Sequence, residues 1–367
     1  MLPAMLRPFG SPVARLSCAV AVFTLGASSA GCHGNVVLDH EPGGTLDGGG
    51  GNDSDAGCTP EPTGPAYPHG SVAVNLGVSI ALYPTGATSG TVPFGTIAGC
   101  ATRLDTPFSS VIGFDAQGRL AAARDALGKG GTTHILVYET GAIGNALPVA
   151  DLNGPATGLD DGTLGALAFD AAGSLYVSQV TTPQNPGGRV LVFPPGADGN
   201  IPPTRTIAGD ATSLRSPVAL AFDVQGSLYV VDVELASVAV FSVDASGDQP
   251  PLRIIGAPGA TQTGLTSPEG VVVDTDGTTY VSDTGANGAG AIRVFAAGAN
   301  GDVSPQRVIV GDETGLGTPS NIGLDPLGRL FVLNASGSVV LFPTSAEGNV
   351  PGVELAASGA ENLAIFR

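Results

Sequence analysis

Residues 267–283 read SPEGVVVDTDGTTYVSD, two apolar runs joined by the polar segment Asp274 to Gly277. In a short hairpin, an aspartate at the first turn position accepts hydrogen bonds from nearby backbone N–H groups. A glycine three residues later takes the positive-φ position that other residues avoid. The stretch therefore predicts two antiparallel strands joined by a tight turn, and it assigns Asp274 to the turn rather than to catalysis.

The same Asp-x-x-Gly turn occurs five times along the chain. Its aspartates follow one another after 55, 53, 51 and 51 residues, and they are Asp115, Asp170, Asp223, Asp274 and Asp325. Each copy is flanked by apolar runs of strand length, as at residues 174–177 and 227–230. A period near 50 residues is typical of repeat architectures in which each unit is one small sheet.

Each unit continues with a third strand that ends in an aromatic residue, and then with a glycine followed by a proline three or four positions later. The aromatic residues are Tyr83, Tyr138, Phe193, Phe241, Phe295 and Phe342. The glycine and proline pairs are Gly90/Pro93, Gly144/Pro148, Gly199/Pro202, Gly247/Pro250, Gly301/Pro305 and Gly348/Pro351. Proline near the start of a fourth strand suits a sheet edge. Four strands per unit define a propeller blade.

The two markers differ in number, because the glycine–proline turn occurs six times and Asp-x-x-Gly only five. The missing first strand is predicted at residues 362–367, and its partners at 71–74, 79–83 and 95–98. One strand from the C-terminus and three from the N-terminus would complete a sixth blade and remove an open sheet edge. The sequence thus predicts an all-β fold, a six-bladed β-propeller with one-plus-three strand closure.

The units resemble the NHL family, whose repeats read Pro-x-Gly, an apolar strand, Asp-x-x-Gly and a strand ending Tyr-Val-x-Asp. Residues 267–283 fit this pattern almost throughout and residues 215–232 nearly as well, whereas residues 121–124 depart from it. The resemblance covers residues 70–367 and implies the propeller fold. It says little about function, because this architecture hosts many tasks.

The N-terminus has the layout of a secretory signal. Two arginines precede the apolar run 18–25, which is too short to span a bilayer, and small residues lead to Cys32. Residues 29–32 resemble a bacterial lipobox, with Ser29 where leucine is usual, and this implies a signal peptide over 1–31 and an acylated Cys32. His33 in place of aspartate implies the outer membrane. Cleavage after Ala30, which would give a secreted or periplasmic protein, is the alternative.

Residues 32–69 are rich in Gly, Pro and Asp and are predicted to be a flexible tether. Cys58 near its end and Cys100 in the propeller remain as an even pair in an oxidising compartment, so we expect them to form a disulfide. The propeller is predicted to span residues 70–367.

The charge excludes one class of partner. There are 14 basic residues against 32 acidic ones, with no basic cluster of the kind that phosphate backbones require. We therefore expect no nucleic acid as a partner. We also expect the protein to contact the membrane only through the N-terminal lipid and to be a monomer.

Candidate ligands gather where inner strands begin and second strands end, at one mouth of the channel. They are Arg124, Gln179, Asp232, Glu269, Asp283, Asn334 and Asn362. Six-bladed lactonases of related fold bind calcium in such a mouth with Glu, Asn and Asp, and these oxygen ligands suit Ca²⁺. Only His69 and His134 accompany the predicted propeller, too few for a zinc site with several histidine ligands. His134 is the one histidine within the repeats, and no Cys–His or Ser–His–Asp set can be assembled around it.

Besides a purely architectural envelope protein, two functions follow. The first is a surface-tethered, non-enzymatic propeller of the bacterial cell envelope that binds a protein, peptide or glycan through its loop faces and needs no cofactor. The alternative is a calcium-dependent hydrolase of lactonase type, with Asp232, Glu269 and Asp283 as ligands.

Overall fold

A computed structural model describes residues 58–104, 111–124, 132–180, 187–355, 357 and 359–367, which belong to one compact unit. The predicted signal peptide, Cys32 and most of the predicted tether lie outside the described residues. Within the described ranges, no helix is both long and apolar enough to cross a membrane.

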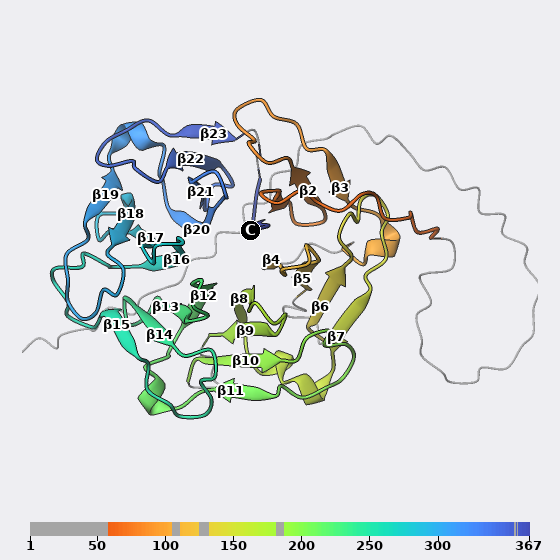
Figure 1. Cartoon of the computed structure of the whole chain (residues 1–367), viewed down its shortest axis with the longest axis horizontal. Coiled ribbons are helices and arrows are strands. Elements are labelled where there is room, and N and C mark those ends of the chain that lie inside the picture. The colour runs from red at the N-terminus through yellow and green to blue at the C-terminus, as the bar shows by residue number, and fades with distance from the viewer. Residues whose placement is uncertain (1–57, 105–110, 125–131, 181–186, 356, 358) are drawn as a thin grey trace, which may run out of the picture. The chain divides into compact units, whose positions relative to one another are not determined.

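The fold is a ring of six antiparallel sheets, each with four strands, as predicted (Figure 1). In chain order the first five complete blades are β4 (Ile112–Phe114), β5 (Leu120–Arg124), β6 (His134–Tyr138) and β7 (Ala150–Asn153); β8 (Leu164–Phe169), β9 (Leu175–Gln179), β10 (Arg189–Phe193) and β11 (Arg205–Ile207); β12 (Pro217–Phe222), β13 (Leu228–Asp232), β14 (Ser237–Phe241) and β15 (Arg253–Gly256); β16 (Pro268–Val273), β17 (Thr279–Thr284), β18 (Gly290–Phe295) and β19 (Arg307–Val310); and β20 (Pro319–Leu324), β21 (Arg329–Asn334), β22 (Val339–Pro343) and β23 (Val353–Leu355).

The sixth blade joins the two ends of the propeller and confirms the predicted closure. It consists of β24 (Asn362–Ile365), β1 (Val72–Asn75), β2 (Ile80–Tyr83) and β3 (Gly95–Ile97), in that order across the sheet. Strand β24 pairs with β1 in antiparallel register from Val72 opposite Ile365 to Asn75 opposite Asn362. The inner strands β4, β8, β12, β16, β20 and β24 contact one another around the ring.

Short 3₁₀ helices follow several outer strands. They are η1 (Cys100–Thr102), η2 (Pro155–Thr157), η3 (Leu159–Asp161), η4 (Asp210–Thr212) and η5 (Asp312–Thr314). Cys58 forms a disulfide with Cys100 at the start of η1, with a Cα–Cα distance of 6.0 Å. This bond ties the segment before β1 to the connection between the sixth blade and β4.

The Asp-x-x-Gly turns have the chemistry that the sequence predicts. Asp274 Oδ1 accepts hydrogen bonds from the backbone N–H groups of Asp276 and Thr278, both at 2.9 Å. Gly277 has a φ of 84°, and its N–H donates to the Asp274 carbonyl. The other four turns repeat the same pair of carboxylate bonds. These carboxylates therefore accept hydrogen bonds within their own turns.

The glycine of the second turn also joins neighbouring blades, which the sequence did not predict. Gly247 has a φ of 64°. Its N–H donates to the carbonyl of Thr206 at 2.7 Å, and its carbonyl accepts from the N–H of Ala208 at 3.1 Å. It thereby extends the edge of the preceding blade with a parallel bridge to Ile207. Five such bridges are found among the described residues, namely Ile97–Gly144, Leu152–Gly199, Ile207–Gly247, Ile255–Gly301 and Ile309–Gly348.

The core lies between blades rather than in one central mass. The aromatic residue that ends each third strand is at most 3% exposed in all six blades. These side chains belong to apolar clusters that combine residues of adjacent blades, as where Phe241 packs with Val190 and Val192 of the previous blade. Each blade thus buries its two faces against its neighbours, and the ring is stable only when it closes.

We predict that Phe366 fastens this closure. Its side chain is 4% exposed, stacks on His69 with ring centroids 4.3 Å apart and packs against Phe114. Phe366→Ala should lower the free energy of unfolding by about 3–5 kcal/mol, the usual cost of removing a buried phenylalanine. The matched control is Phe94→Ala, since Phe94 is 46% exposed and its loss should cost about 1 kcal/mol or less. Urea denaturation measures both, and equal losses would contradict the proposed role of Phe366.

Candidate functional site

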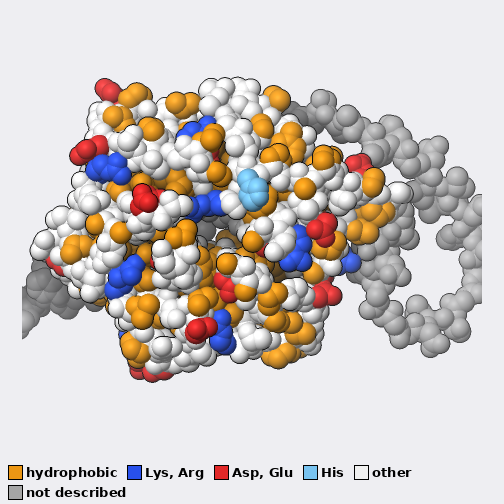
Figure 2. All heavy atoms as spheres, viewed as in Figure 1, with side chains coloured by type: hydrophobic (Ala, Val, Ile, Leu, Met, Phe, Trp, Pro, Cys, Tyr) orange, Lys and Arg blue, Asp and Glu red, His pale blue; other side chains and the backbone are white. Residues whose placement is uncertain are grey.

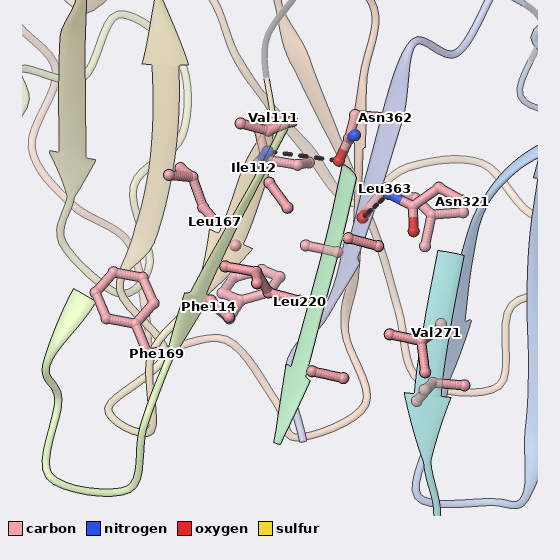
Figure 3. Close-up of a pocket in the computed structure, with 18 of the residues that line it drawn as sticks. Val111, Ile112, Phe114, Leu167, Phe169, Leu220, Val271, Asn321, Asn362 and Leu363 are labelled. Carbon is pink, nitrogen blue, oxygen red and sulfur yellow. Dashed lines mark hydrogen bonds between the residues drawn. The ribbon is translucent and has the colours of Figure 1, made fainter. Parts of the chain in front are cut away.

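The six inner strands enclose a central cavity of about 560 Å³ (Figure 3). One residue per blade, at equivalent positions opposite the middle of the second strand, forms an apolar ring within it. We call these side chains the apolar belt: Ile112, Leu167, Leu220, Val271, Ile322 and Ala364. The face seen in Figure 2 is hollowed at its centre. The volume lies in the range usual for small-molecule pockets.

β-Bulges determine which residues face the channel at the predicted mouth. The pairing of β8, β12, β16 and β20 with their second strands skips one residue near the start of each inner strand. The skipped residues are Gly165, Val218, Glu269 and Ser320, and all four line the cavity. A β-bulge re-aims the side chain of the extra residue. The bulge residues of the mouth are consequently apolar along β8 and β12 and polar along β16 and β20, while Thr163 before β8 adds a hydroxyl on the first side.

Glu269 is the half-buried acid on this polar side. Its Oε1 accepts a hydrogen bond from the Ser267 hydroxyl at 3.4 Å, and no ion pair among the described residues involves it. Burial raises the pKa of Glu269 above its usual value, and the negative charge of Asp283 adds to this rise while the bond from Ser267 opposes it. Glu269 is therefore a carboxyl group whose charge lacks a compensating cation.

Asn362 and Asn321 lie toward one end of the cavity, with Phe114 and Phe169 further along it (Figure 3). Oδ1 of Asn362 accepts from the N–H of Ile112 at 3.4 Å, and Nδ2 of Asn321 donates to the carbonyl of Leu363 at 3.4 Å. The two bonds join β24 to β4 on one side and to β20 on the other. Asn362 thus lines the channel, as predicted, but its carbonyl oxygen also serves the closure of the ring.

The acids at the ends of second strands are turned toward the loops that lead into their own blades. Asp232 is fully buried, and its carboxylate accepts hydrogen bonds from the N–H groups of Arg215 at 2.6 Å, Ser216 at 2.8 Å and Leu235 at 3.0 Å. Asp283, also fully buried, accepts from two loop N–H groups and from Nε of Arg293 at 2.9 Å. Neither residue lines the cavity.

The amides at equivalent positions behave in the same way. Asn334 Oδ1 accepts from Gly317 N, and its Nδ2 donates to the Gly315 carbonyl, both at 3.0 Å. Gln179 Nε2 donates to the carbonyls of Gly158 and Leu159. Arg124 ends β5 opposite His134. Of the seven residues predicted at the mouth, only Glu269 and Asn362 face the channel, so the structure does not bring the predicted set together.

No cluster of three His, Cys, Asp or Glu side chains that could hold a metal ion is found among the described residues. The two histidines of the propeller lie elsewhere. Nδ1 of His134 is 2.8 Å from Oδ1 of Asp151 on the outer strands β6 and β7, and His69 stacks on Phe366. Neither histidine lines the channel, so neither is placed to act on a molecule there.

Comparison with known proteins supports the fold alone. No protein-family model matches the chain, and no curated protein sequence does. Among solved structures, 797 chains match. One of them is the crystal structure of a protein of unknown function from Bacteroides caccae, which is 9% identical and superposes with a TM-score of 0.53 over 82% of this chain and all of that one. The fold and the channel define the chain as a six-bladed β-propeller.

Because the carboxylate of Asp232 accepts hydrogen bonds from three backbone N–H groups, we predict that its role is to stabilise the fold. Asp232→Ala should lower the free energy of unfolding by about 3 kcal/mol or more, since each buried donor left without a partner costs about 1–3 kcal/mol. Glu234→Ala in the same turn is the control; Glu234 is exposed, and its change should stay within about 0.5 kcal/mol. Thermal and urea unfolding test this, and a small effect for Asp232→Ala would mean that its carboxylate is free for another role.

Proposed function

We propose that the protein is a non-enzymatic binding propeller of the bacterial cell envelope, which takes its ligand at the channel and the loops around it. The observation that carries this proposal is that most polar groups near the channel are bonded to the backbone rather than exposed to the cavity. The carboxylates of Asp232 and Asp283 are bonded to backbone N–H groups, while the channel presents the apolar belt. An apolar cavity with a few polar groups is the usual form of a small-molecule site. Proteins, peptides and glycans remain the partners proposed for the loop faces.

The proposal includes the cellular setting that the N-terminal sequence suggests. Acylation of Cys32 would hold the propeller at the outer membrane, with residues 32–69 as its tether. Membership of the NHL family belongs to the same proposal; it is supported by the Asp-x-x-Gly repeats and by the propeller fold that they predict.

The second candidate, a calcium-dependent hydrolase of lactonase type, is favoured by Glu269 alone. This carboxyl group lines the channel mouth and has no charged partner among the described residues. Ca²⁺ requires six to eight oxygen ligands, several of them carboxylate or carbonyl oxygens. Asp283 could supply one only by releasing two loop N–H groups and Arg293.

Calcium titration by calorimetry separates the two functions. We expect no saturable heat with millimolar calcium chloride, and no hydrolysis of a panel of aliphatic and aromatic lactones above the buffer rate. Stoichiometric calcium uptake that Glu269→Gln abolishes, together with calcium-dependent lactone hydrolysis, would overturn the binding function in favour of the hydrolase.

The membrane anchor is tested in a bacterial host that processes lipoproteins. Cys32→Ser should move the protein from the membrane fraction to the soluble fraction, because the acylated thiol is lost. Cys18→Ser, which changes a cysteine within the predicted signal peptide, should leave the distribution unchanged. Membrane fractionation of the Cys32→Ser protein equal to that of the unmodified protein would contradict lipidation at Cys32.

A further inference from the structure

Four charged residues line the cavity, namely Asp115, Asp170, Glu269 and Arg367. The two aspartates hold Asp-x-x-Gly turns, whereas Glu269 and Arg367 lie toward opposite ends of the cavity and differ in their partners. Arg367 lines the cavity and donates from Nη1 to the carbonyl of Val273 at 3.0 Å. Burial lowers the pKa of Arg367, and the Asp274 carboxylate opposes this shift. Glu269 has only the hydroxyl of Ser267 as its partner in the described part of the chain. Glu269 is therefore a carboxyl group of the channel with neither an ion pair nor a backbone N–H partner among the described residues.

The distance between these ends suits an elongated molecule. Glu269 lies near the start of β16 and Val273, which binds Arg367, at its end. Four residues of extended strand span roughly 13 Å. Between them lies the apolar belt, with Leu220 and Val271 as examples. The part of a ligand that lies against these side chains is apolar, because they give no hydrogen bonds in return for those lost to water.

The polar side of the mouth offers acceptors beside Glu269. The bulge of the next inner strand, β20, places Ser320 at the position equivalent to Glu269, and the Ser320 hydroxyl donates toward the Leu333 carbonyl at 3.3 Å. Its oxygen lone pairs are left to accept. On the opposite side the bulge residues are Gly165 and Val218, and Thr163 before β8 adds one hydroxyl to the lining. A head group with several N–H donors would thus find a carboxylate and a hydroxyl together on the side of Glu269 and Ser320.

We propose that the channel binds an amphipathic primary amine, with its ammonium group at Glu269 and its apolar body along the apolar belt. This inference rests on the proposed binding function and names the chemical class of its ligand. The ammonium group supplies three donors and a cation, which Glu269 does not have among the described residues. The protein's net charge of −18 also favours the approach of a cation.

The charged surroundings of Glu269 agree with this choice. Asp283 on β17 is the acid that acts on Glu269, and its own carboxylate is paired with Arg293 of β18. Ser320 and Asn321 of β20 are uncharged. A ligand carboxylate, in contrast, would have to pair with Arg367, where Asp274 already provides a negative charge. Charge complementarity therefore favours an amine over a fatty acid.

The test is calorimetric titration of the mature protein with octylammonium chloride, sodium octanoate and octanol, three probes that differ only in their head group. We expect octylammonium to bind with a stoichiometry of one and with an affinity about tenfold or more above that of the other two. Glu269→Gln should reduce octylammonium binding by about tenfold, which corresponds to the loss of about 1.4 kcal/mol from a charge-assisted hydrogen bond. Asp276→Asn, at an exposed turn of the same blade, is the matched control and should bind normally.

Two results would overturn the amine site. One is equal binding of octanol, octanoate and octylammonium; the other is octylammonium binding that Glu269→Gln leaves unchanged while circular dichroism shows a native fold. Both would leave a non-enzymatic binding function in place. Saturable calcium uptake with lactone hydrolysis in the same preparation would instead overturn the proposed function itself, so the two failures are distinguishable.

Discussion

The pairing of β24 with β1 brings the two ends of the propeller into one sheet, with Val72 opposite Ile365 and Asn75 opposite Asn362. Each blade buries its faces against its neighbours, so an open array of six blades would leave two apolar faces in water. The channel exists because this pairing closes the ring. The bonds from Asn362 to β4 and from Asn321 to β24 then hold the inner strand between its neighbours.

Closure also determines how polar side chains are used near the channel. Each chain entry into an inner strand leaves backbone N–H groups without strand partners, and such groups must be satisfied when they are buried. Asp232 and Asp283 meet this need with their carboxylates, and Asn334 with its amide. Glu269 differs because it is the extra residue of a bulge, which turns it toward the cavity. The polar residues of the mouth thus divide into those that stabilise loops and one acid that faces the channel.

The repeat pattern was sufficient to predict the fold. Asp274 and Gly277 form a turn whose hydrogen bonds are local, and local bonds can be read from spacing alone. The blade count and the closure followed from comparing the two repeated turns. The parallel bridge from Gly247 to Ile207 could not be predicted in this way, because it joins residues of two blades whose relative position depends on the closed ring.

The site was predicted less well than the fold. The sequence places Asp232 and Glu269 at the same face of the disc but does not say which way each side chain points. That direction depends on the bulges, which are irregularities of pairing rather than of composition. Pro217, Pro268 and Pro319 each precede the extra residue of a bulge. A proline at the start of an inner strand is therefore the sequence signal that could have indicated these bulges.

The buried acids Asp232 and Asp283 bind the loops at the strand ends, and Glu269 is the acid that faces the channel mouth. A crystal structure of the mature protein, grown with millimolar calcium, tests this arrangement. We expect Asp232 and Asp283 to be bonded to loop N–H groups, and Glu269 to have no metal partner at the channel mouth. A calcium ion held jointly by Glu269 and Asp283, with the loop bonds broken, would contradict it.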